Sequence, residues 1–409
     1  METTTIGVNP ERENIRLKIE EIADVLCANQ NKLRIGLMSG NMGIALFLFC
    51  YYHIHKKDEK ILEKAFLLLD EVIERVNDGD IFHSICDGLA GIGWAINYLC
   101  IRKYFDTNDK NELLSSADDF LTNRLDMIFA KHQYDFLHGE LGVGLYFTTR
   151  ISDNHIFING LNTILSHLIG SAERKGANVK WQSVLQKEET GKVTGYNISL
   201  AHGMSAIAVM LSKFIKHNIC KEASKDLLDG LIQYLLSQRI DVQEIGSYFP
   251  TVSLESYKIG KSRLGWCYGD LGISIALWQV SQVLQNTELE KFAIEVLLHA
   301  TKRKNLRDNS IEDAGLCHGT ASVGHIFYRM WWNTRLPEFK NAADYWMNET
   351  LKMAKYKDGL AGYKASRKPE YGGFVNEYGL VEGIAGIGLA LLFYYHEIEP
   401  TWDECLLLS

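Results

Sequence analysis

Apolar residues recur with the period of an amphipathic helix in seven stretches of this chain. In residues 58–76, for example, Ile61, Ala65, Leu69 and Val72 follow the spacing of three or four residues that gathers side chains on one helix face. Similar stripes lie near 11–27, 111–130, 155–171, 222–238, 288–303 and 339–355. Each stripe predicts a helix with one buried face and one face in water.

A second kind of segment follows each amphipathic stretch. It begins with a glycine motif, such as SGNMG at 39–43 or DGLAG at 87–91, and stays apolar on almost every face for about three turns. Such a segment predicts a helix buried on all sides. Glycine at its entry permits close backbone approach. The first glycines of the seven motifs are Gly40, Gly88, Gly139, Gly203, Gly269, Gly319 and Gly383.

Seven pairs of one outer and one inner helix predict an all-α fold, an (α/α)7 toroid of fourteen helices. An open solenoid is the alternative, but it normally needs polar end repeats, and the terminal repeats here are no more polar than the others. The count of 34 Gly against 5 Pro agrees with a helical chain, because proline breaks helix interiors. No Pro- or Ser-rich linker is evident, so we expect one domain over residues 1–409.

Three longer excursions interrupt the repeats, near 174–199, 241–265 and 356–381. Each precedes a glycine motif, so we expect all three at the same end of the ring, where loops on a rigid scaffold commonly carry function. The first contains β-branched runs around turn residues and predicts a short hairpin. It is also our candidate for contacting a peptide.

Composition narrows the function classes. The net charge is −8 with dispersed Lys and Arg, which argues against nucleic-acid binding. No signal peptide is evident, and the longest apolar run, 42–52, is about half of a membrane span. We therefore expect a cytoplasmic protein whose eight cysteines are reduced. The glycine motifs lack the GxxxxGK[ST] pattern of a phosphate-binding loop, which excludes that form of nucleotide binding.

Residues that precede the first glycines should share one rim of the ring. They are Ser39, Asp87, His138, His202, Tyr268, His318 and Glu382. One position further back stand Cys267 and Cys317, so two thiols and the His318 imidazole converge. Two thiolates and one imidazole suit Zn²⁺ with a fourth position open to water or substrate. The alternative is that both cysteines are ordinary core residues. We expect Cys27, Cys50, Cys86, Cys100, Cys220 and Cys405 to be core or surface thiols.

Other polar residues near the motifs are candidates for catalysis, each with a structural alternative. His202 could act as a general acid or base facing the metal, or cap a helix. Asp135 could orient an imidazole, or serve as a helix N-cap. Arg263 could stabilise a developing enolate, or form a loop salt bridge. Tyr268 could wall the cavity. His138 and His325 are assigned to structural roles and left out of the catalytic set.

The seven glycine motifs, together with GWCYGD around Cys267, LCHG around Cys317 and SLAHG around His202, resemble lanthionine synthetase C-like proteins over essentially the whole chain. The resemblance implies an (α/α)7 toroid with zinc at one end of its cavity. It implies Cys267, Cys317 and His318 as zinc ligands. It further implies His202 as acid/base, Asp135 as the active-site aspartate, and Arg263 and Tyr268 as the arginine and tyrosine beside the first ligand. Ala206 and Ser322 depart from the pattern, since they replace the second glycine of their motifs.

The resemblance also implies an activity, which is the addition of substrate Cys thiolates to dehydroalanine or dehydrobutyrine in a precursor peptide of leader plus core. We expect a stand-alone cyclase that works with a separate dehydratase and a transporter, in a complex peripheral to the inner face of the membrane. Two alternatives are another thiol alkylator, such as a glutathione-adding relative or a zinc prenyltransferase, and a non-enzymatic zinc or peptide-binding scaffold.

Overall fold

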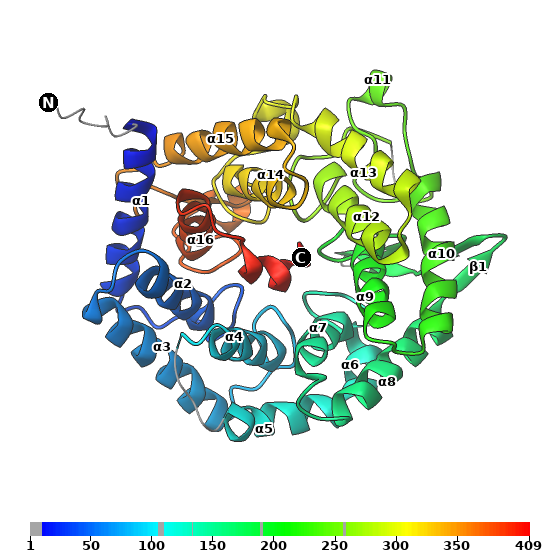
Figure 1. Ribbon diagram of the computed structural model, residues 1–409, viewed down its shortest axis with the longest axis horizontal. Helices are drawn as coiled ribbons and strands as arrows, with labels where there is room; N and C mark the ends of the chain where they lie inside the picture. The colour runs from blue at the N-terminus through cyan, green and yellow to red at the C-terminus, as the bar shows by residue number, and fades with distance from the viewer. Residues whose placement is uncertain (1–9, 105–109, 133, 189–190, 257–258) are drawn as a thin grey trace, which may run out of the picture.

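The computed structural model describes residues 10–104, 110–132, 134–188, 191–256 and 259–409. Its inner helices are α2 (Asn41–Ile54), α4 (Leu89–Ile101), α7 (Glu140–Arg150), α9 (Met204–Lys216), α12 (Asp270–Leu284), α14 (Thr320–Thr334) and α16 (Ile384–Tyr395). Its outer helices are α1 (Pro10–Cys27), α3 (Glu59–Asn77), α5 (Lys110–Thr122), α6 (Leu125–His132), α8 (Ile156–Ser171), α10 (Lys221–Ser237), α13 (Thr287–Ala300) and α15 (Pro337–Lys352). Figure 1 shows the two sets as concentric rings.

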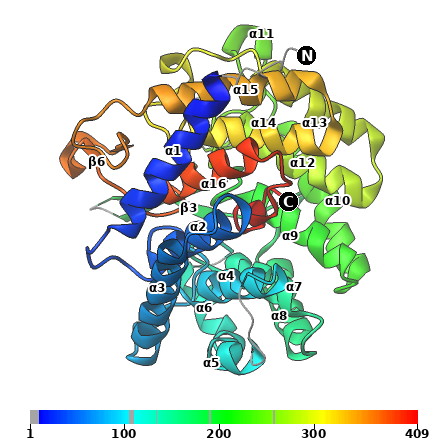
Figure 2. The same ribbon diagram turned by 60° about the vertical axis from the view of Figure 1, so that its left-hand side comes forward.

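The ring is closed, as the prediction of a toroid requires. Helix α16 of the last repeat contacts α2 of the first, and α1 lies against both α16 and α15. Figure 2 shows α1 running across this closing point. Burial follows the two predicted helix types: α2 is buried at every position from Asn41 to Tyr51, whereas α3 is buried along one stripe. No helix of the described residues is both long and apolar enough to cross a membrane.

The third outer position differs from the prediction of one helix over 111–130. Two helices, α5 and α6, meet there at a turn around Asn123. The cause is local, because Thr and Asn favour bonds to nearby backbone over the helix interior. The Thr122 hydroxyl donates to the Asp118 carbonyl at 2.8 Å, and α5 ends there. With the short α11 (Val242–Ile245) added, the described residues hold more than the fourteen helices expected.

The excursions contain the small amount of β-structure. The first forms two hairpins rather than one, from β1 (Glu173–Lys175) with β2 (Asn178–Lys180) and β3 (Ser183–Glu188) with β4 (Gly191–Gly195). The second carries α11, and the third carries β5 (Ala365–Ser366) and β6 (Phe374–Val375). Short 3-10 turns are η1 (Arg307–Asn309), η2 (Pro369–Tyr371) and η3 (Thr401–Leu406). Residues 189, 190, 257 and 258 of the excursions lie outside the described residues.

Loop carbonyls, rather than side chains, cap the inner helices. In α2, α4, α9, α14 and α16 the first helical N–H donates to a carbonyl seven residues earlier, as in Asn41 to Arg34 at 2.8 Å and Leu89 to Phe82 at 2.7 Å. The loop must therefore fold tightly over the helix end, and the motif glycines leave the space for it. A Cβ atom at Gly386 would overlap the carbonyl oxygen of Leu380. Gly269 also has a φ of +91°, which strongly favours glycine.

These loops are joined to one another by backbone hydrogen bonds. In six of the seven motif loops, all but that of Leu137, the residue two positions before the first glycine donates its N–H to the carbonyl of the equivalent residue in the next loop. We call these seven residues the backbone belt: Met38, Cys86, Leu137, Ala201, Cys267, Cys317 and Val381. Six such bonds occur among them, of 2.8–3.4 Å, including one from Val381 of the last repeat to Met38 of the first. The belt therefore joins the last repeat to the first at the rim, where the helices also close the ring.

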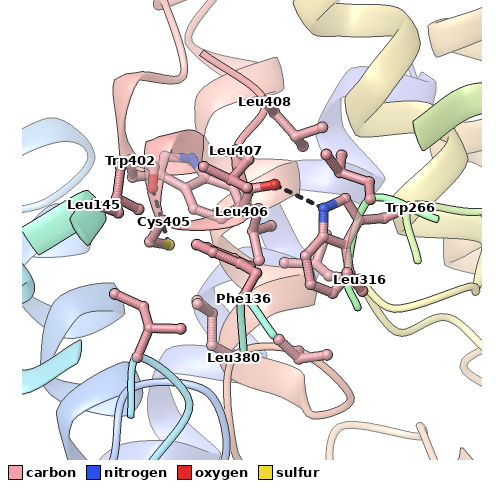
Figure 3. Packing of buried hydrophobic residues seen from close by; sticks show 14 of the residues in the cluster. Phe136, Leu145, Trp266, Leu316, Leu380, Trp402, Cys405, Leu406, Leu407 and Leu408 are labelled. Carbon is pink, nitrogen blue, oxygen red and sulfur yellow. Dashed lines mark hydrogen bonds between the residues drawn. The ribbon is translucent and has the colours of Figure 1, made fainter. Parts of the chain in front are cut away.

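The C-terminal segment fills the interior of the ring. Figure 1 places the C-terminus at its centre, and Figure 3 shows Leu406, Leu407 and Leu408 among buried residues of several repeats. All three leucines are buried. The buried Asp403 anchors the segment, because its carboxylate accepts hydrogen bonds from Arg329 and lies 2.9 Å from the His325 ring. The structural role expected for His325 agrees with this contact.

We predict that Gly386→Ala destabilises the fold by about 2–3 kcal/mol or more, because the added Cβ overlaps backbone that cannot move away cheaply. The matched control is Gly170→Ala in α8, where a Cβ atom meets nothing within 4 Å. Alanine there should stabilise the protein by up to about 1 kcal/mol. Denaturant unfolding of the two variants measures both effects, and equal stabilities would contradict the close-approach argument.

Candidate metal centre

The structure brings Cys267, Cys317 and His318 together. Their ligand atoms all lie within 4.8 Å of one another, and the Cys267 Sγ is 3.9 Å from the His318 Nδ1. Cys267 and Cys317 are consecutive members of the backbone belt, joined by a 3.2 Å bond from the Cys267 N–H to the Cys317 carbonyl. The prediction that these three side chains converge is therefore confirmed in geometry.

The electrostatics of this cluster favour a thiolate. The Cys317 thiol donates a hydrogen bond to Cys267, and this bond lowers the pKa of Cys267 well below its usual range. Burial opposes the shift, while His318 and the positive charge of Arg263 support it. Burial also lowers the pKa of His318, but its hydrogen bond to Cys267 outweighs this and raises the pKa overall. The lowered pKa of Cys267 thus favours its thiolate form, which is the form that binds metal ions.

Neighbouring loops and the C-terminal segment fix the position of Cys267. The N–H of Trp266 donates to the Ser322 Oγ at 2.9 Å, and its indole N–H donates to the Leu406 carbonyl at 2.7 Å. Figure 3 shows this second bond. Ser322 is one of the two departures from the glycine pattern, so the hydroxyl that replaces glycine there supplies an acceptor. The ligand loop is thereby attached to the segment that fills the ring.

His202 and Asp135 form a hydrogen-bonded pair on the same rim. The His202 Nδ1 lies 2.8 Å from one carboxylate oxygen of Asp135, and the other oxygen accepts the His138 N–H at 2.7 Å. The belt bond from Ala201 to Cys267 places the His202 loop beside the loop of the first ligand. Asp135 is therefore the partner of an imidazole and also bonds the loop backbone. It is not a helix N-cap, because Gly139 takes that position in α7 and no side chain caps the helix.

The pair changes the titration of both groups. Burial alone would lower the pKa of His202, but the Asp135 carboxylate outweighs it and raises the pKa above 6.5. Burial would raise the pKa of Asp135, but the hydrogen bond and charge of His202 lower it overall. His202 therefore keeps a proton to higher pH than a free histidine, as a general acid needs.

Arg263 and Tyr268 complete the candidate set. Arg263 stands in the loop before Cys267, and its charge acts on all three ligand groups. The Tyr268 ring lies 6.4 Å from the His202 ring, and its hydroxyl accepts a 3.5 Å bond from the Asn197 amide. All seven candidate residues thus stand in the motif loops at one rim of the ring.

Sequence reasoning missed features of this rim. His138, which we assigned to a structural role, stacks on His202 with ring centroids 5.8 Å apart. Cys86, which we assigned to core or surface, belongs to the backbone belt. Aligning the residue two positions before each glycine would have shown this. Two carboxylates on other motif loops carry arginine partners, Asp87 with Arg34 and Glu382 with Arg367.

Comparisons with known proteins agree with the toroid fold. Residues 31–407 match the model of the lanthionine synthetase C-like protein family. The chain belongs to this family. A relative, the nisin biosynthesis protein NisC of Lactococcus lactis subsp. lactis, is 22% identical, with 97% of this chain and 96% of that protein covered. The solved structure of a nisin cyclase superposes with a TM-score of 0.76 at 18% identity, covering 97% of this chain and 98% of that one.

For this lanthionine synthetase C-like protein we predict that His202 titrates above pH 6.5 and that Asp135→Asn lowers its pKa. The carboxylate stabilises the imidazolium, so the charged form should persist to higher pH in the unchanged protein than in the variant. NMR titration of the histidine ring signals measures the difference. Glu295→Gln, a change at an acid hydrogen-bonded to Tyr248, serves as control and should leave His202 unshifted. An unchanged His202 titration in Asp135→Asn would contradict the pairing.

Proposed function

We propose that this protein is a zinc-dependent lanthipeptide cyclase, which forms lanthionine or methyllanthionine thioethers in a dehydrated precursor peptide. The observation that carries the proposal is the junction of two motif loops. The loop of Cys267 presents a metal-ligand cluster, and the adjacent loop presents His202 with its carboxylate partner. A thiol-binding centre and a proton donor on neighbouring loops are what a thiol addition requires.

The cluster suits zinc in the identity of its donors, and one donor separation matches that of a tetrahedral site. At Zn–S distances of about 2.3 Å, the ligand atoms of a tetrahedral site stand roughly 3.5–4 Å apart. The separation of the Cys267 Sγ and His318 Nδ1 is 3.9 Å. Three protein ligands leave the fourth position to a substrate, which is the arrangement of catalytic zinc sites. Sulfur-rich donors also favour a soft substrate ligand such as a thiol.

The residues then have distinct roles. Zinc held by Cys267, Cys317 and His318 would keep a substrate cysteine deprotonated at neutral pH. The thiolate adds to the β-carbon of the dehydro residue, and the π electrons of the double bond move to an enolate. The positive charge of Arg263 stabilises the enolate. His202, oriented by Asp135, donates a proton to the α-carbon.

The balance of this reaction needs no redox partner. One S–H bond and one C=C π bond are lost, while one C–S bond and one C–H bond form. The proton that leaves the substrate thiol passes to solvent, and the proton given by His202 is replaced from solvent.

The substrate class follows from the relatives, whose names refer to nisin biosynthesis and nisin cyclisation. We propose a peptide that carries cysteines together with dehydroalanine or dehydrobutyrine. A separate dehydratase is then the enzyme that supplies these dehydro residues. We further propose a cytoplasmic protein that assembles with this dehydratase and a transporter at the membrane.

Incubation of the purified protein with a dehydrated, cysteine-containing peptide tests the proposal. We expect loss of free thiols and a defined ring stereochemistry. Cys317→Ala should remove bound zinc and activity but keep helical circular dichroism, because the helices pack without metal. Cys100→Ala, at a thiol on the far end of α4, is the control and should retain both. Thiol loss and stereochemistry equal to those without protein would refute the proposal.

His202→Asn should retain zinc and lose ring formation. Removal of the proton donor should lower kcat by at least about a hundredfold, which is typical for a general acid. Zinc content and single-turnover cyclisation are measured on the same preparation. His217→Asn, at the C-terminal end of α9, controls for a general effect of histidine loss. Full cyclisation by His202→Asn would remove this residue from the mechanism.

A further inference from the structure

An apolar groove lies beside the rim that carries His202 and Asp135. Its walls come from the loop after α3 and from α5 and α6, and it encloses about 220 Å³. The apolar lining residues are Ile81, Phe82, Phe120, Met127 and Ile128. Three of these are about half exposed, with exposed fractions of 41% for Ile81, 46% for Phe82 and 53% for Met127. A cluster of exposed large apolar residues commonly marks a contact surface.

The groove is linked to the candidate site through His83 and His138. His83 lines it, and the His83 Nε2 lies 2.8 Å from the His138 carbonyl oxygen. His138 in turn stacks on His202 and bonds to Asp135 through its backbone. Helix α6, the opposite wall, ends at His132, three residues before Asp135. A chain that places reacting atoms at His202 and continues over His138 therefore arrives at this groove.

The size and charge of the groove indicate its occupant. About 220 Å³ is below the 300 Å³ or more of typical small-molecule sites, so the groove suits one large side chain of a longer molecule. Arg124 lines the groove with its guanidinium 4.4 Å from the Phe120 ring centroid, and it has no carboxylate partner among the described residues. An arginine in this setting pairs well with an acidic side chain.

We propose that this groove binds the substrate peptide outside its reacting residues, taking one large apolar side chain while Arg124 pairs with an acidic side chain nearby. Side chains two positions apart in an extended peptide share a face, so the pair should be spaced i, i+2. This inference rests on the proposed function, because the peptide is the proposed substrate. It adds a recognition site distinct from the metal cluster and the His202–Asp135 pair.

Short fluorescein-labelled peptides of Gly and Ser test the groove. One carries Phe and Glu two positions apart, a second has Ser in place of Phe, and a third has Lys in place of Glu. By fluorescence anisotropy the Phe/Glu peptide should bind about tenfold more tightly than the Ser/Glu peptide, a difference of about 1.4 kcal/mol. Equal binding of all three peptides would overturn the proposal.

Variants locate the binding. Met127→Asp, and Ile81→Ser on the opposite wall, should each remove the preference for Phe. Leu67→Asp on α3, at a leucine that is 58% exposed, is the matched control and should keep it. Arg124→Glu should weaken the Phe/Glu peptide and favour the Phe/Lys peptide. Loss of the preference in Leu67→Asp as well, or no reversal in Arg124→Glu, would contradict the groove as the site.

The peptides contain neither cysteine nor dehydro residues, so their binding does not depend on cyclisation. Selective binding without cyclisation of a dehydrated peptide would refute the proposed function and leave the groove intact. Cyclisation with no selectivity, either in binding or in KM between substrates with and without the Phe/Glu pair, would refute the groove alone.

Discussion

The backbone belt is the constraint on which the rest of this structure depends. Most motif loops fold over the end of an inner helix and cap that helix with a loop carbonyl, and six of the seven bond to the next loop at the belt residue. Because a buried N–H or C=O without a partner is costly, these bonds hold the loops in fixed register around the ring. Side chains that would otherwise stand on flexible connections are thus held on a rigid rim, which is the requirement for a preorganised site.

The geometry of the candidate site depends on the fixed register of the motif loops. Cys267 and Cys317 belong to consecutive loops, so the belt bond between them sets their spacing, and the loop of His202 precedes them in the same order. The C-terminal segment also helps to hold the Cys267 loop in place, since the indole N–H of Trp266 donates a hydrogen bond to the Leu406 carbonyl inside the ring. The Cys267–Cys317–His318 cluster, the His202–Asp135 pair and the core packing are therefore connected to one another. Family membership and the cluster of two thiols and an imidazole agree with the proposed thioether chemistry. The groove that His83 lines is the site that we propose for binding the peptide.

Cys86 shows that the same position in the repeat does not by itself make a cysteine part of the ligand cluster. It occupies the same repeat position as Cys267 and Cys317, yet it stands outside the cluster that the described residues form. The reason is the order of the ring. The Cys86 loop is bonded to the loops of Met38 and Leu137, whereas the two ligand loops are bonded to each other and to those of Ala201 and Val381. Burial raises the pKa of the Cys86 thiol, so it also lacks the thiolate character of Cys267.

The sequence by itself determined the helix pairs, their number and the residue types at the rim, because hydrophobic periodicity reports which helix faces are buried and the glycine motifs mark where the chain passes closely over a helix end. It also determined the candidate ligands Cys267, Cys317 and His318, since their positions repeat with the motifs. It did not reveal the break between α5 and α6, the belt bond between the last and first repeats, the C-terminal segment at the centre of the ring, or the groove beside His83. The helix break has a local cause at Thr122. The other three features arise from contacts between residues far apart in the chain, such as Trp266 with Leu406 and His83 with His138. Hydrophobic periodicity specifies which face of each helix is buried. Only the packing of all seven repeats decides which residues of different repeats come into contact.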